Sequence, residues 1–76
     1  MQKVNIKMLR KQFPLFDWTA KRAFFAYDYY GHDPDSGRRV RVICERTTAG
    51  SLEWRAAVLG RFAEWRDMGT LENFIR

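Results

Sequence analysis

Apolar and polar residues alternate almost without interruption from Arg39 to Glu45. A period of two is typical of a half-buried β-strand. A turn sequence, Asp33-Pro34-Asp35-Ser36-Gly37, comes shortly before it, with a proline that presets φ and a glycine that accepts a left-handed conformation. An aromatic run from Phe24 to Tyr30 lies on the other side of this turn. The pattern therefore predicts a β-hairpin over about residues 21–46.

The length of the loop fixes which side chains share a face of this hairpin. A four-residue loop from Pro34 to Gly37 pairs Asp33 with Arg38. One face, the predicted core side, then carries Phe25, Tyr27, Tyr29, Gly31, Val40, Val42 and Cys44. The opposite face carries Phe24, Ala26, Asp28, Tyr30 and His32 beside Arg39, Arg41, Ile43 and Glu45. The second face therefore mixes aromatic and basic groups.

The first strand of the hairpin has a competing interpretation. Residues 18–30 also fit a helix, because Ala20, Ala23 and Tyr27 lie at helical spacing and Asp17 is a good cap. The density of aromatic residues favours a pleated surface, and the second strand needs a partner. We therefore predict a strand here and keep the helix as the alternative.

Two helices are predicted outside the hairpin. The first spans about residues 5–13, with Asn5 as N-cap and the dipeptide Phe13-Pro14 as its end. The second spans about residues 51–68, with Ser51 as cap and Gly69 as stop. Its apolar arc contains Leu52, Trp54, Val58, Leu59, Phe62, Ala63 and Trp65, and Arg55 and Arg66 interrupt that arc. The tail from Thr70 to Arg76 suits a helical turn slightly better than an edge strand.

These elements predict an α+β fold with the order α-β-β-α. The long C-terminal helix would cover one face of the hairpin, and the short helix would lie against its edge. Two strands leave both edges open, so we expect a third strand from the tail or from a second subunit, and a homodimer. The chain of 76 residues forms one domain, 1–76, because it is near the lower limit for a single hydrophobic core.

The net charge of +5 is concentrated at the N-terminal end of the chain. Residues 1–22 carry six cations, Lys3, Lys7, Arg10, Lys11, Lys21 and Arg22, against Asp17 alone. Residues 23–50 and 51–76 each balance four arginines against four acids. The sequence thus describes a neutral domain with a basic leading segment.

Several kinds of chemistry are disfavoured by the residues present. One histidine and one cysteine do not supply a zinc site, so we expect neither metal nor cofactor. Cys44 falls on the core side of its strand, far from His32 at the hairpin tip, which argues against a thiol nucleophile and for a buried, unreactive side chain. We therefore predict a protein without enzymatic activity. No signal peptide or membrane span is recognised, and we expect a cytoplasmic protein.

The aromatic and basic face of the hairpin indicates nucleic-acid binding. Flat side chains stack on bases, while arginines contact phosphates or guanine edges. The basic N-terminal helix adds sequence-independent phosphate contacts, and Arg and Trp in the main helix are residue types that anchor partners. The candidate binding residues are Lys3, Lys7, Arg10, Lys11, Tyr30, Arg39, Arg41, Arg55 and Arg66.

A protein partner is the alternative function. Asp28 and Glu45 share the aromatic and basic face and weaken the case for nucleic acid. In size and texture the chain resembles the small stand-alone proteins of bacteriophages and mobile elements, although no specific motif carries this resemblance. It implies an inhibitor or adaptor, anti-CRISPR-like in style, that binds a host complex such as a nucleic-acid-handling machine through an aromatic and Arg-rich surface.

Overall fold

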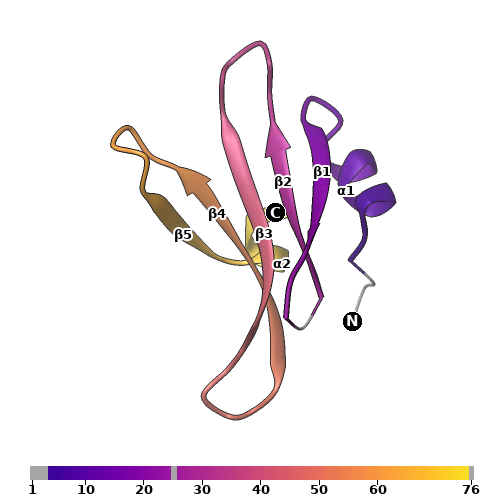
Figure 1. The fold of residues 1–76 in the computed structure, drawn as a ribbon, viewed down its shortest axis with the longest axis vertical. Coiled ribbons are helices and arrows are strands. Elements are labelled where there is room, and N and C mark those ends of the chain that lie inside the picture. Colours follow the sequence, from indigo (N-terminus) through magenta and orange to yellow (C-terminus); the bar gives the residue numbers. More distant parts are fainter. Residues whose placement is uncertain (1–3, 25, 76) are drawn as a thin grey trace.

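The alternating segment after the turn is the central strand of an antiparallel sheet. The computed structural model describes residues 4–24 and 26–75, and Figure 1 shows their arrangement. The strands are β1 (Asp17–Arg22), β2 (Tyr27–His32), β3 (Arg39–Arg46), β4 (Leu52–Leu59) and β5 (Trp65–Thr70), and the helices are α1 (Ile6–Gln12) and α2 (Leu71–Ile75). The strand order in space is β1-β2-β3-β4-β5, so each strand pairs with the next one along the chain.

The predicted hairpin is confirmed in its turn and in its register. The Asp33 N–H donates to the carbonyl of Arg38 at 2.9 Å, and the Gly37 N–H donates to the carbonyl of Asp33 at 2.8 Å. Tyr29 pairs with Val42, and Gly31 pairs with Val40. Gly37 has a φ of 77°, the left-handed conformation that favours glycine.

The ambiguous segment between residues 18 and 30 forms strands rather than a helix. It contains most of β1 and the start of β2, and the Ala23 N–H donates to the carbonyl of Ala26 at 3.0 Å in the turn between them. Phe25, predicted on the core side, lies outside the described residues. The hairpin predicted over residues 21–46 is therefore confirmed only for β2 and β3, which are two of the five strands of a larger meander, while Lys21 and Arg22 belong to β1.

The predicted α+β fold with the order α-β-β-α is wrong, because the structure has five strands where the prediction has two, and the largest difference lies in its C-terminal half. Residues 51–68 form β4, a turn and most of β5 in place of a long helix, and α2 has only five residues. The tail is thus a helical turn, as its apolar spacing indicates. The architecture is a five-stranded antiparallel sheet with two short helices.

Competition between two periods explains this error. Leu52, Trp54 and Val58 fit the apolar arc of a helix, but together with Ala56 they also occupy every second position of a strand. The open edge of β3 needs a partner, and β4 pairs along it from Val40↔Val58 to Arg46↔Leu52. Tertiary pairing therefore overrides local helix propensity.

A tight turn between β4 and β5 lies where the long helix was predicted, so these two strands form a hairpin. The Gly60 N–H donates to the carbonyl of Glu64 at 2.7 Å, and Ala63 has a φ of 62°. A Cβ at Gly60 would overlap Glu64 Oε1, so this close approach requires glycine or a displaced glutamate. Gly69, predicted as a helix stop, has a φ of 90° and lies where the pairing between β4 and β5 is irregular.

The N-terminal helix is confirmed. Asn5 is its N-cap, and its Oδ1 accepts the N–H of Met8 at 2.9 Å. The helix ends at Gln12, with Phe13 in a non-helical conformation before Pro14. Its single fully buried residue, Leu9, faces the sheet, while Lys7, Arg10 and Lys11 are exposed.

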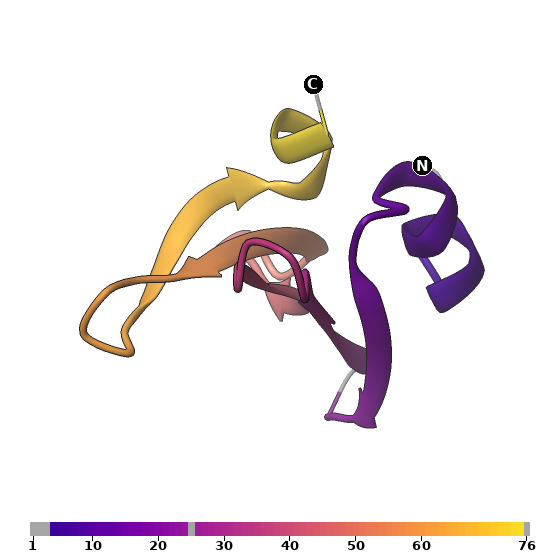
Figure 2. The same cartoon turned by 90° about the horizontal axis from the view of Figure 1, so that it is seen from above.

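Both helices lie on the same side of the sheet, and no described helix lies on the other side (Figure 2). The covered face buries a core of Leu9, Trp18, Tyr29, Val40, Val42, Ala56 and Leu71. Trp18 packs against the backbone of Gly31, its cross-strand partner, with ring atoms 3.0 Å from where a Cβ would stand. The two faces of the sheet therefore have separate roles, one in the core and one at the surface.

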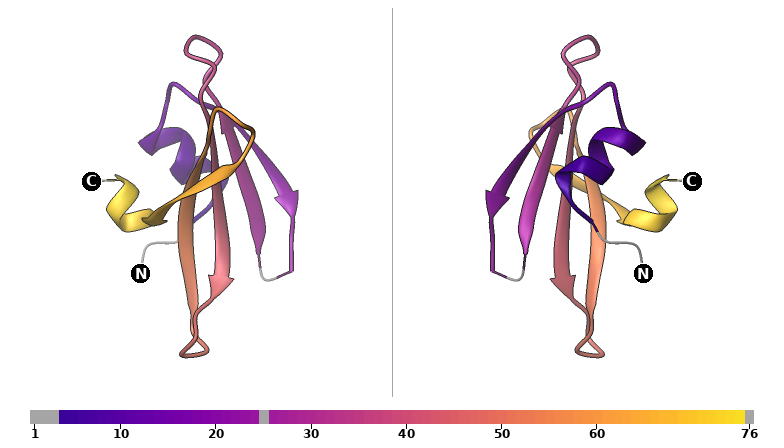
Figure 3. Two further views of the ribbon diagram at one scale, coloured as in Figure 1. Left: turned by 90° about the vertical axis from the view of Figure 1, so that its left-hand side faces the viewer. Right: turned by 90° about the vertical axis from the view of Figure 1, so that its right-hand side faces the viewer.

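The sheet also removes the reason for expecting a strand from a second subunit. The turns between β2 and β3 and between β3 and β4 extend from opposite ends of the molecule, and β5 crosses the other strands at an angle (Figure 3). The five strands come from one chain, so the oligomeric state stays a prediction that these pairings neither require nor test. Among the described residues, no helix has the length and apolar character to cross a membrane.

Candidate functional site

The uncovered face of the sheet gathers the polar and aromatic residues that alternate with the core. We call this surface the open face. It comprises Asp17, Thr19 and Lys21 of β1, Asp28, Tyr30 and His32 of β2, Arg39, Arg41, Ile43 and Glu45 of β3, Glu53, Arg55, Ala57 and Leu59 of β4, and Trp65 and Asp67 of β5. The registers place these side chains together because residues paired across neighbouring strands point to the same side.

Three side chains meet in the middle of the open face. The guanidinium carbon of Arg41 lies 4.9 Å from the ring centroid of Trp65. The ring of Tyr30 lies 6.1 Å from the ring of Trp65, between centroids, at an interplanar angle of 56°. These distances are within the range of cation–π and aromatic contacts. We call this group the Tyr30–Arg41–Trp65 platform.

A small residue in β4 allows the platform to form. Tyr30 is in β2 and Trp65 is in β5, so two strands separate them. Tyr30 pairs with Arg41, and Arg41 pairs with Ala57, which is buried on the open face. Because Ala57 has only a methyl group, the large side chains on either side of it have room to approach each other.

Arg41 is incompletely paired in this arrangement. Its Nε is buried, and no hydrogen-bond partner for it exists among the residues that the structure describes. A buried polar group without a partner is uncommon in folded proteins and is a reason to look for a ligand. A hollow of about 250 Å³ lies beside the guanidinium and is lined by Arg41, Ile43, Glu45, Arg55, Ala56, Ala57, Trp65 and Asp67.

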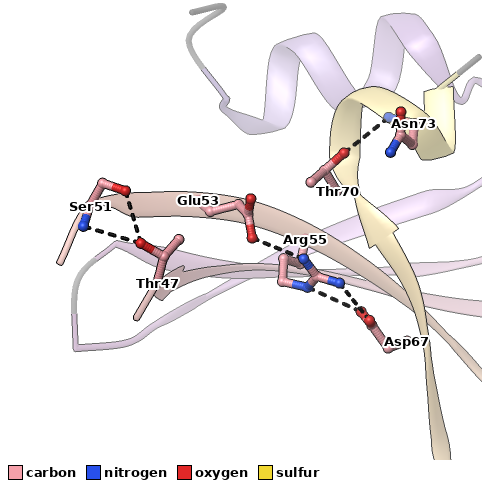
Figure 4. A network of polar contacts seen from close by, with 7 residues as sticks. All are labelled: Thr47, Ser51, Glu53, Arg55, Asp67, Thr70 and Asn73. Carbon is pink, nitrogen blue, oxygen red and sulfur yellow. Dashed lines mark hydrogen bonds and ion pairs between the residues drawn. The ribbon is translucent and has the colours of Figure 1, made fainter. Parts of the chain in front are cut away.

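Arg55, in contrast, is held by carboxylates on both sides (Figure 4). Its Nε and Nη2 donate to Asp67 at 3.3 and 2.6 Å, and its Nη1 donates to Glu53 at 2.9 Å. Hydrogen bonding to Asp67, and then to Glu53, raises the pKa of Arg55, and the same guanidinium lowers the pKa of Asp67. This ion pair joins β4 to β5, so we assign Arg55 a structural role at the site.

The open face is close to electrically neutral. Four cations, Lys21, Arg39, Arg41 and Arg55, share it with five carboxylates, Asp17, Asp28, Glu45, Glu53 and Asp67. Dispersion and stacking on the platform are therefore better supported as the source of binding energy than attraction to a strongly charged ligand.

The basic residues of the N-terminal segment lie elsewhere. α1 contacts β1, the first strand of the sheet, on the covered side (Figures 1 and 2). Exposed cations at Lys7, Arg10, Lys11, Lys21 and Arg22 face only Asp17 as an acid within these two elements. We call these five residues the basic flank. Lys21 is the one residue that the flank shares with the open face, and no residue of the flank is part of the platform.

The predicted site residues are thus divided among three places. Tyr30, Arg39, Arg41 and Arg55 share the open face, and Lys7, Arg10 and Lys11 belong to the flank. Arg66 pairs with Val58, a residue of the covered side, and therefore points away from Arg41. Lys3 lies outside the described residues.

Sequence reasoning missed Trp65 and Ala57 as members of the site. Trp65 fits the apolar arc of the expected helix, which hides its place on a strand. The signal in the sequence that could have indicated strands is the position of Arg55 and Arg66, because both interrupt the apolar arc of the predicted helix.

Cys44 and His32 add no further chemistry to the site. Cys44 is half-buried on the covered side rather than fully buried as predicted. Burial raises the pKa of its thiol, and Asp28 raises it further. His32 pairs with Arg39 near the turn. Within the described residues, no three His, Cys, Asp or Glu side chains are grouped so that they could hold a metal ion.

Comparisons with protein-family models, with curated proteins and with solved structures found no match to this chain.

Proposed function

We propose that the protein binds single-stranded nucleic acid on the open face of its sheet. The observation that carries this proposal is the Tyr30–Arg41–Trp65 platform, two aromatic rings and a guanidinium in contact on a sheet face that no described helix covers. Sheet-based single-strand binders combine such rings, on which bases stack, with cations that contact the backbone.

Each member of the platform has a separate role. Trp65 and Tyr30 offer ring faces to two bases, and the hollow beside Trp65 receives part of one nucleotide. Arg41, two residues from Arg39 on the same strand face, contacts phosphate or a base edge through its guanidinium. Paired bases in a duplex do not expose their faces, so single strands are preferred.

The basic flank supplies the electrostatic part of the interaction. The flank is formed by α1 and β1. β1 is an edge strand of the sheet, and it pairs with β2, the strand that carries Tyr30. A single strand of nucleic acid that stacks on the platform reaches the basic flank by crossing the edge of the sheet at β1. The flank then contributes salt-dependent, sequence-independent phosphate contacts.

A protein partner is the second candidate, and the neutrality of the open face favours it. Arg, Trp and Tyr are the residue types that dominate protein–protein hot spots, and all three occur in the platform. On this interpretation the protein is an inhibitor or adaptor that docks the same face on a host complex. The two candidates differ in whether the isolated protein binds an oligonucleotide at low salt.

A titration of fluorescently labelled oligothymidylate, about twelve nucleotides long, tests the first candidate. Base–aromatic stacking is worth about 1–3 kcal/mol per base, so Trp65→Ala should weaken binding by a factor between about 5 and about 150. Trp65→Phe keeps a ring and should retain most of the affinity. Phe62→Ala is the matched control, because Phe62 is an exposed aromatic (83 %) in the turn after β4, outside the platform.

The outcome separates the candidates. The proposal is supported if the native protein and Phe62→Ala bind the single strand more tightly than the duplex, and if Trp65→Ala binds the single strand at least about fivefold more weakly. Unchanged circular dichroism of each variant shows that the fold is intact. Absence of binding by the native protein at low ionic strength rejects nucleic acid and leaves the protein partner.

A further inference from the structure

A separate cavity lies on the covered side of the sheet, between the two helices. It has a volume of about 220 Å³. Val4 and Met8 line it from the α1 side, Leu71, Glu72 and Ile75 from α2, and Thr47, Ser51, Leu52, Glu53, Trp54 and Thr70 from the strands and the turn between β3 and β4. None of these residues belongs to the platform, and Glu53 is the one lining residue that the cavity shares with the open face.

The interior of this cavity is mainly apolar and partly buried. Leu71 is fully buried, and Val4, Met8, Trp54 and Ile75 are half-buried. Pockets that hold drug-sized ligands measure roughly 300–1,000 Å³. A cavity of about 220 Å³ therefore fits a smaller apolar body, such as one aryl ring or one branched alkyl group.

The polar residues of the cavity define the charge of its occupant. Among the residues that the structure describes, its lining contains two carboxylates, Glu53 and Glu72, and no Lys, Arg or His. Glu53 Oε2 already accepts from Arg55 Nη1 at 2.9 Å, so part of its charge is balanced. Glu72 is exposed in the first turn of α2 and forms no ion pair within residues 4–24 and 26–75. Glu72 therefore sets the preference for a cation at the rim.

Trp54 and the hydroxyl groups strengthen the same preference. An indole ring is the best aromatic partner for a cation, and Trp54 lines the cavity beside Glu53. The hydroxyls of Thr47 and Ser51, 2.9 Å apart, and that of Thr70 retain capacity to accept hydrogen bonds from an ammonium group. We propose that this cavity binds a small apolar cation, one aryl or branched alkyl group joined to a protonated amine.

A matched set of three probes tests the proposal: 4-phenylbutylamine, 4-phenylbutanol and 4-phenylbutyrate. They share the apolar group and differ in charge. NMR titration should place the amine in the cavity, with shifts at the Trp54 indole N–H and at the methyl groups of Met8, Leu71 and Ile75. Affinity should fall in the order amine, alcohol, acid, with about a fivefold step for one exposed ion pair near 4 Å.

Two controls make the result interpretable. Glu72→Gln should bind the amine more weakly than the native protein does, and should bind the alcohol equally well. If that variant does not fold, added salt should weaken binding of the amine, but not of the alcohol, to the native protein. Trp65→Ala should bind the amine normally, because Trp65 lies on the open face.

The inference is overturned by equal or tighter binding of the acid, by no saturable binding of any probe, or by shifts confined to the open face. Shifts at the cavity that depend on protein concentration without a probe would show that a second copy of the chain occupies it.

Discussion

At the scale of single residues, Gly31 shows how one missing side chain sets the packing of the core. A Cβ at this position would stand 3.0 Å from two ring carbons of Trp18. Trp18 is only 5 % exposed, and the centroid of its ring lies 6.0 Å from that of Phe13 and 5.9 Å from that of Phe16. Its Nε1 also donates to the carbonyl of Phe13 at 3.3 Å. The ring is therefore held on several sides.

Gly31→Ala should consequently destabilise the protein. Overpacking costs about 1–3 kcal/mol, and the gain from replacing glycine in a strand, about 0.5–1 kcal/mol, offsets only part of it. We expect a net decrease of about 1 kcal/mol in the free energy of unfolding, measured by urea denaturation. In a Trp18→Leu background the same substitution should cost less, because the smaller side chain leaves room. Additive effects would contradict this account of Gly31.

Asp33 gives the stability of the turn between β2 and β3 a dependence on pH. Its carboxylate accepts from Ser36 Oγ at 2.7 Å and from the N–H of Asp35 at 3.0 Å, and these bonds lower its pKa. A pKa that is lower in the folded than in the unfolded state stabilises the fold above the unfolded value of 3.8. That contribution is lost as the pH falls through the folded pKa.

Asp33→Asn should therefore flatten the acid end of the stability profile. The measurement is the urea midpoint from about pH 7 down to pH 2, on either side of the reference pKa of aspartate. The native protein should lose more stability below about pH 4 than the variant does. Asp35→Asn removes one charge from the same turn and is the matched control. Parallel profiles for the native protein and Asp33→Asn would refute this role.

At the scale of elements, the sequence predicted the helix ends and turns that depend on a few neighbouring residues. The cap at Asn5, the end of α1 before Pro14 and the turn from Asp33 to Gly37 follow from dihedral and hydrogen-bonding preferences of a few residues. Local preferences do not predict that β4 and β5 are strands, because the apolar residues of Leu52–Leu59 fit the period of a helix as well as that of a strand. Pairing with the edge of β3 decides between them, and that pairing is not local.

The basic flank has a measurable consequence for the proposed function. Lys7→Gln with Lys11→Gln should weaken oligothymidylate binding and flatten the slope of log K against log salt by about 0.7 for each phosphate that the variant no longer neutralises. Arg61→Gln with Arg66→Gln removes the same charge from the turn after β4 and from β5, and should leave the slope nearly unchanged. Equal changes in both double variants would mean that net charge, and not the flank, sets the slope. Circular dichroism checks that α1 remains folded.

At the scale of the whole molecule, the sequence predicted which residues of β2 and β3 share a face, but not the rest of the candidate site. Tyr30, Arg39 and Arg41 fall on one face as soon as the hairpin register is known, and the structure confirms that register. Trp65 and Ala57 reach the same face only through the order of all five strands. The separation of the basic flank from the platform likewise depends on which side of the sheet α1 covers. Those relations arise from long-range packing, which residue patterns do not specify.

The three tryptophans are spectroscopic probes of both faces of the sheet. Trp18 is buried in the core, Trp54 lines the cavity between the helices, and Trp65 belongs to the platform on the open face. Each indole N–H gives its own NMR resonance, so one titration follows three places in the molecule.

The measurement that tests the central claim most directly follows these three resonances while unlabelled oligothymidylate is added at low salt. Stacking on the platform predicts that the Trp65 indole N–H shifts with saturation, while those of Trp18 and Trp54 stay in place. Saturable shifts of Trp54 with Trp65 unmoved, or no shift of any of the three, would contradict nucleic-acid binding on the open face.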